Sequence, residues 1–70
     1  MQIIETGRLY RHYKGNIYRI IALATDSETL DDVIVYSSIK DGKTWVRPYS
    51  MWNEVVDNSG TLRFTLVNED

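Results

Sequence analysis

The side chains best suited to chemistry come from separate segments of this chain. His12 is the only histidine, and an ordinary imidazole titrates near about pH 6.5, which suits acid–base work or ligand binding at neutral pH. There is no cysteine to serve as a nucleophile or zinc ligand, and the sequence carries neither a nucleophile elbow nor a glycine-rich phosphate loop. We therefore expect a non-enzymatic protein. A hydrolase that uses His12 and Glu28 as its acid–base pair is the catalytic alternative.

The second half of the chain carries a cluster of aromatic residues around Arg47. Trp45 and Arg47 are two positions apart, so they share one face of a strand, and Val46 points to the opposite face as the expected core residue. Tryptophan and arginine are the residues most enriched at binding hot spots. The pattern predicts an aromatic groove that binds a peptide or a small polar ligand with an anionic group for Arg47. The predicted groove residues are Tyr10, His12, Glu28, Tyr36, Trp45 and Arg47. Met51 and Trp52 are expected in the core.

Basic and aromatic residues alternate in the segment 8–19, which contains no acid. Aromatic rings that stack on bases, beside cations that neutralise phosphates, are typical of surfaces for single-stranded nucleic acid. The alternative function is therefore binding of RNA or single-stranded nucleic acid through Arg8, Arg11, Lys14 and Arg19. The formal net charge of −2 argues against it, because nucleic-acid-binding domains are usually strongly basic.

Four acidic residues lie between positions 26 and 32, without a cation among them. Their spacing differs from that of a calcium loop, and a single histidine leaves zinc without a second nitrogen ligand. We expect a solvated acidic loop, with neither a metal nor a cofactor.

Length and pattern predict a single all-β domain. The 70 residues suit one domain, with a core over about 7–67 and a polar tail at 68–70. Runs of β-branched and aromatic residues separated by turn residues predict strands at 7–13, 17–25, 32–39, 44–47, 55–56 and 61–67. One helical turn is expected within 49–54, and Asp41-Gly42 predicts a type I′ hairpin turn.

Short strands with tight turns must protect their sheet edges, and closure is one solution. We expect an SH3-like, partly open barrel of five to six strands; an OB-like barrel and an open meander with one helix are the alternatives. The longest apolar stretch, residues 20–24, is far below the roughly 20 residues that span a bilayer, and no secretory signal is apparent. A cytoplasmic location without membrane contact is the expectation.

Three short motifs in this order resemble a small bacterial family catalogued as "domain of unknown function 1653". They are His-Tyr-Lys-Gly at 12–15, Ser-Glu-Thr at 27–29 and Trp-Val-Arg-Pro at 45–48, and the resemblance extends over roughly 7–64. It implies a compact β domain and no particular reaction. The family commonly has a second histidine where this chain has Asp26, so a two-histidine site would be incomplete here. The matching positions are His12, Lys14, Tyr18, Glu28, Tyr36, Trp45, Arg47, Pro48 and Met51.

Overall fold

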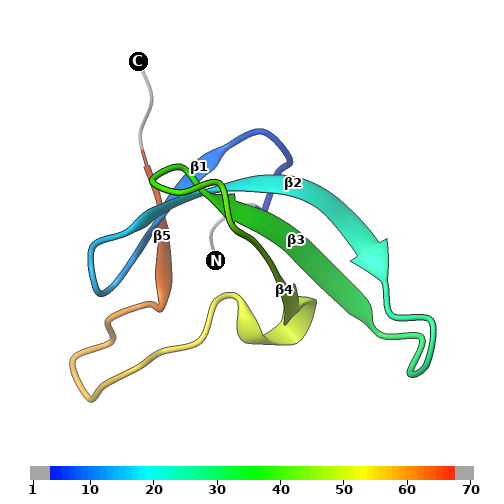
Figure 1. The fold of residues 1–70 in the computed structure, drawn as a ribbon. Helices are drawn as coiled ribbons and strands as arrows, with labels where there is room; N and C mark the ends of the chain where they lie inside the picture. Colours follow the sequence, from blue (N-terminus) through cyan, green and yellow to red (C-terminus); the bar gives the residue numbers. More distant parts are fainter. Residues whose placement is uncertain (1–3, 68–70) are drawn as a thin grey trace.

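One antiparallel sheet organises the molecule (Figure 1). The computed structural model describes residues 4–67, and the predicted tail at 68–70 lies outside them. Along this part the elements are β1 (Leu9–His12), β2 (Ile17–Thr25), β3 (Asp32–Ser38), β4 (Thr44–Pro48), a 3₁₀ turn η1 (Tyr49–Met51) and β5 (Phe64–Leu66). The strand order is β4-β3-β2-β1-β5, so β4 and β5 are the edges of an open sheet. The prediction of an all-β, incompletely closed domain with one short helical turn is confirmed.

The connections follow the turn residues, with one difference from prediction. Gly15, at φ +110°, closes the β1–β2 turn and donates its N–H to the carbonyl of His12 at 2.7 Å. In the β3–β4 loop, only Gly42 has a positive φ, whereas Asp41 does not. The type I′ prediction is therefore wrong, because that turn needs positive φ at both central residues. A longer loop of residues 39–42 is closed by the bond from the Ser38 N–H to the Lys43 carbonyl at 2.9 Å.

The core lies on one face of the sheet, against the irregular segment that leads from η1 to β5. Its buried members, each at most 6% exposed, are Tyr10, Ile20, Ile34, Tyr36, Trp52 and Phe64. The indole of Trp52 is fully buried, and its N–H has no hydrogen-bond partner. Ring packing therefore fixes its position: it meets Tyr10 and Tyr36 edge-on, at centroid distances of 5.5 and 5.0 Å.

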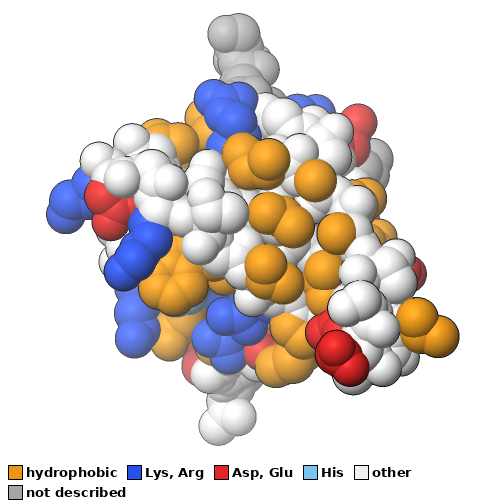
Figure 2. Space-filling view, turned by 45° about the vertical axis from the view of Figure 1, so that its right-hand side comes forward, with side chains coloured by type: hydrophobic (Ala, Val, Ile, Leu, Met, Phe, Trp, Pro, Cys, Tyr) orange, Lys and Arg blue, Asp and Glu red, His pale blue; other side chains and the backbone are white. Residues whose placement is uncertain are grey.

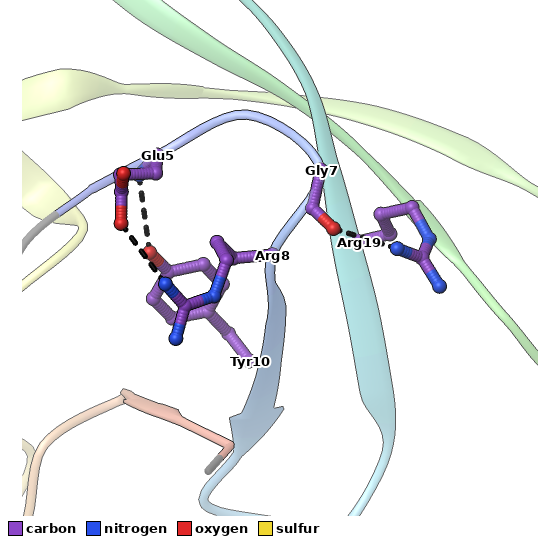
Figure 3. A network of polar contacts seen from close by, with 5 residues as sticks. All are labelled: Glu5, Gly7, Arg8, Tyr10 and Arg19. Atoms are coloured by element: carbon purple, nitrogen blue, oxygen red, sulfur yellow. Dashed lines mark hydrogen bonds and ion pairs between the residues drawn. The ribbon is translucent and has the colours of Figure 1, made fainter. Parts of the chain in front are cut away.

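A polar network ties the start of the described chain to β1 and β2 (Figure 3). The backbone N–H of Glu5 donates to the Tyr10 hydroxyl at 3.2 Å, and the Glu5 carboxylate accepts from Arg8 Nη1 at 3.1 Å. Arg19 Nη1 donates to the Gly7 carbonyl at 2.6 Å. These contacts hold the chain across the buried ring of Tyr10.

Strand pairing decides which face of β4 meets the core. Ile34 pairs with Arg47 and Tyr36 with Trp45, and residues opposite each other in an antiparallel pair share a face. Trp45 and Arg47 do share a face, as predicted, but it is the core face. Val46 lies on the other side, 62% exposed, so its assignment to the core is wrong. Met51 is also exposed at 39%, whereas the burial of Trp52 is confirmed.

Candidate functional site

Arg47 is a partly buried cation on an edge strand. Its guanidinium carbon lies 5.6 Å from the centre of the Phe64 ring, and its Nε is buried without a hydrogen-bond partner. In the described part of the chain, the two ion pairs are Arg8–Glu5 and Arg63–Glu54. Arg47 belongs to neither, although a guanidinium can offer five N–H donors. Among the described residues, the Arg47 guanidinium therefore has no acidic partner.

His12 lies beside Arg47, across the ring of Phe64. The His12 ring meets Phe64 edge-on at 5.1 Å, and its Nδ1 accepts the backbone N–H of Lys14 at 3.2 Å. Burial lowers the pKa of His12 below its ordinary 6.5, and the positive charges of Arg63, Arg47 and Lys14 lower it further. The imidazole is therefore neutral at pH 7. Because Nδ1 accepts a hydrogen bond, the ring proton sits on Nε2, which is a donor.

Arg63 adds a third cation, which directly precedes β5. Its Nε donates a hydrogen bond to a Glu54 carboxylate oxygen at 3.0 Å, and its Nη2 lies 3.0 Å from the same oxygen in an ion pair. Its guanidinium carbon lies 5.9 Å from the Tyr13 ring centre. The sequence does not predict Arg63 as a site residue, because it lies about fifty positions from His12. Only the β1–β5 pairing, in which His12 is opposite Phe64, brings the two together.

Two exposed aromatic rings flank this cluster, each beside a cation. Tyr13 is 45% exposed and lies 5.8 Å from the Lys14 ammonium. Trp45 is also 45% exposed, with the Lys43 ammonium 5.3 Å from its ring centre. Figure 2 shows Lys and Arg side chains gathered around hydrophobic ones at the left of the view. We call this surface the cation–aromatic site; its residues are His12, Tyr13, Lys14, Lys43, Trp45, Arg47 and Arg63.

Of the six predicted groove residues, the structure brings His12, Trp45 and Arg47 to this site. Tyr10 and Tyr36 are 0% and 6% exposed, so their rings belong to the core and not to an open groove. Glu28 is exposed in the β2–β3 loop, at the opposite end of the molecule from the β1–β2 turn (Figure 1). The acid–base pair of His12 and Glu28 does not form.

The predicted nucleic-acid cations are also divided. Arg8 is paired with Glu5, and Arg19 is bonded to the Gly7 carbonyl. Arg11 alternates with Tyr10 and His12 along β1 and so points to the opposite face of the sheet. Lys14 alone joins the cation–aromatic site.

A shallow depression of about 270 Å³ lies elsewhere, where β4 runs into η1. Asp31, Asp32, Pro48, Tyr49 and Ser50 line it. Across residues 4–67, no three histidine or carboxylate side chains gather as they would around a metal ion. No helix among these residues has the length and apolarity needed to cross a membrane.

Comparison with known proteins gives a consistent family assignment. The family model "Protein of unknown function (DUF1653)" matches residues 8–66. The crystal structure of a DUF1653 protein from Bordetella bronchiseptica is similar over 100% of this chain and 95% of that one, with 35% sequence identity and a TM-score of 0.80. A search of curated proteins found no match.

Proposed function

This chain belongs to the DUF1653 family, and we propose that it is a non-enzymatic binding module that holds the anionic group of a peptide or small polar ligand at Arg47. One observation carries the proposal: the Arg47 guanidinium lies against Phe64 with a buried, unpaired Nε and no carboxylate partner. A buried unpaired donor is costly. Because Nε is closed to solvent, an oxyanion would be held by the terminal nitrogens of the guanidinium, through charge-assisted hydrogen bonds.

The neighbours of Arg47 favour the same ligand charge. Arg63 and Lys14 are close enough to lower the pKa of His12. An anion bound there therefore meets the positive potential of Arg47, Arg63 and Lys14, which come from three separate segments of the chain. The Nε2 proton of neutral His12 offers a second donor. Trp45, on the same face of β4, supplies an apolar wall for the rest of the ligand. We also propose that the open sheet is of the SH3-like type and that the protein is cytoplasmic.

The test is an NMR titration of the full chain with sodium sulfate and, separately, with an acetylated tetraglutamate peptide. We expect the backbone amides of His12 and Lys14 and the Nε–H of Arg47 to shift with saturation. Arg47→Met keeps the length of the side chain and removes its charge, so these shifts should disappear while the domain stays folded. Arg11→Met is the matched control, because it removes one exposed cation from the opposite face of the sheet.

Shifts that are unchanged in Arg47→Met, or equally reduced in Arg11→Met, would show nonspecific charge attraction and overturn the proposal. Saturation by neither anion would also overturn it. If Arg47→Met failed to fold, Arg47→Lys would give the answer, because a lysine keeps the charge but loses the planar donor array; undiminished binding in that variant would count against a guanidinium site.

A further inference from the structure

The exposed rings of the cation–aromatic site have no role in holding an anion, and they point to the class of ligand. Tyr13 and Trp45 are each nearly half exposed, although large aromatic side chains in so small a domain are valuable for its core. Each ring has a cation within 5.9 Å of its centre. A flat ring beside cations binds a ligand that is aromatic at one end and anionic at the other.

Trp45 and Arg47 have the spacing that such a ligand requires. They are two positions apart on one strand and share a face, so their backbones are about 6.6 Å apart along β4. One sugar unit bridges this separation between a phosphate on the guanidinium and a base on the indole. A second ring, Tyr13, lies beside His12 at a centroid distance of 4.6 Å.

The charges favour a phosphate over a carboxylate. Neither of the ion pairs found among residues 4–67 includes Lys14, Lys43 or Arg47. Arg63 is paired with a single oxygen of the Glu54 carboxylate. Such an excess of donors suits a group with several charged oxygens. The exposed ammonium of Lys43 is 5.3 Å from the Trp45 ring centre, so it can move from the ring to the phosphate when a base takes its place.

Building on the proposed function, we infer that the ligand is a nucleotide, either free or within a single strand, with its phosphate on Arg47 and its base stacked on Trp45. Tyr13 provides a stacking position for a neighbouring base when the nucleotide is part of a strand. The recognised chemistry, one phosphate and one adjacent base, is the same in both cases. Stacking accepts any base, because every base has a π face.

The test compares ligands of similar charge that differ in the base. Calorimetry or NMR titration at low salt measures AMP against ribose 5-phosphate, and an eight-residue oligothymidine against its abasic counterpart. We expect AMP to bind about tenfold tighter than ribose 5-phosphate, the size of a single stacking contact. An oligothymidine that binds tighter than AMP, and tighter than its abasic counterpart, identifies a strand as the source; equal binding of AMP and oligothymidine identifies the free nucleotide.

Variants locate the stacking contact. Trp45→Leu should reduce AMP binding to the level of ribose 5-phosphate and leave ribose 5-phosphate binding unchanged, whereas Trp45→Phe should keep most of the preference. Tyr49→Leu is the matched control: Tyr49 is 42% exposed, but it lies beside Asp31 and Asp32, where an anion is repelled. Its removal should change neither affinity.

The outcomes separate this inference from the proposed function. If ribose 5-phosphate binds as tightly as AMP, and both need Arg47, the nucleotide inference is overturned and the anion site remains. If the acidic peptide binds more tightly than every nucleotide, the ligand is a peptide and the inference is again overturned. If no phosphate compound binds and Arg47→Met equals the wild type, both are overturned.

Discussion

Trp52 and Phe64 stack face to face, with ring centroids 3.9 Å apart and ring planes 4° apart. This contact fastens the irregular segment after η1 to β5. Phe64 also meets His12 edge-on and lies beneath the Arg47 guanidinium, so one ring joins the core to the cation–aromatic site. The position of the site therefore depends on core packing.

Replacement of Trp52 should unfold or nearly unfold the domain. Trp52→Ala leaves a large cavity among Tyr10, Tyr36 and Phe64, and such substitutions cost about 3–5 kcal/mol. Small domains bury proportionally less surface than large ones, and a single core in a chain of this size rarely supplies more than about 3–5 kcal/mol of stability. Urea denaturation followed by circular dichroism measures the loss. Trp45→Ala is the control, with an expected change of about 0.5 kcal/mol or less; equal losses in the two variants would contradict the assigned burial.

The two tryptophans should differ in access to a quencher. Trp45 is 45% exposed, and Trp52 is 0% exposed. Acrylamide is uncharged and so is not concentrated by the cations around Trp45. We expect it to quench a fraction of the wild-type fluorescence and to quench the Trp45→Phe variant very little. Strong quenching of the remaining indole would show that Trp52 is open to solvent.

Protonation of His12 should lower the free energy of unfolding of the domain at acidic pH. Its folded pKa lies below the ordinary 6.5 because of burial and of Arg63, Arg47 and Lys14, so the unfolded chain binds the proton more readily. The free energy of unfolding then decreases as pH falls below about 6.5 and levels off below the folded pKa. Urea titrations between pH 7.5 and 5 measure this slope. His12→Gln should flatten it; an unchanged slope would place its origin in other groups.

Anion binding should strengthen over the same pH range. A bound anion raises the pKa of His12, because an opposite charge favours the protonated form. The rings of Tyr13 and Tyr18 also face the imidazole. Sulfate is a suitable probe because its charge is constant in this range. Its affinity should rise from pH 7.5 to 5 in the wild type and stay flat in His12→Gln. The same rise in both would assign the effect elsewhere.

Removal of the acid beside Arg63 should favour anion binding. Glu54→Gln cancels the charge that pairs with Arg63, and since this pair is partly exposed, the cost in stability should be about 1 kcal/mol or less. Sulfate affinity should increase, as measured by NMR titration. Glu5→Gln is the matched control, because it frees Arg8 within the N-terminal network. Equal gains in the two variants would point to net charge and not to the site.

The boundaries of β2, β3 and β4 were predictable because local pattern controls them, whereas β1 (Leu9–His12) and β5 (Phe64–Leu66) are shorter than the predicted 7–13 and 61–67. β2 spans the predicted 17–25, β3 and β4 differ from prediction by one residue each, and the short predicted strand at 55–56 corresponds to an isolated bridge between Val55 and Leu62. The hairpin type at Asp41-Gly42 was not predictable from the dipeptide. The loop length depends on which residues of β3 and β4 pair, and the Ser38–Lys43 closure leaves room for a wider turn.

The sequence by itself determined an all-β domain, the residues that alternate on β4, and the identity of the cations and rings available for binding. Only the tertiary structure decided which face of β4 meets the core, and therefore that Arg47 lies over Phe64 while Val46 is exposed. The reason is that the alternation of side chains along a strand sorts the residues onto two faces but does not show which face is buried. The β1–β5 pairing, which joins distant parts of the chain, places Phe64 and Arg63 beside His12, and this contact assembles the site.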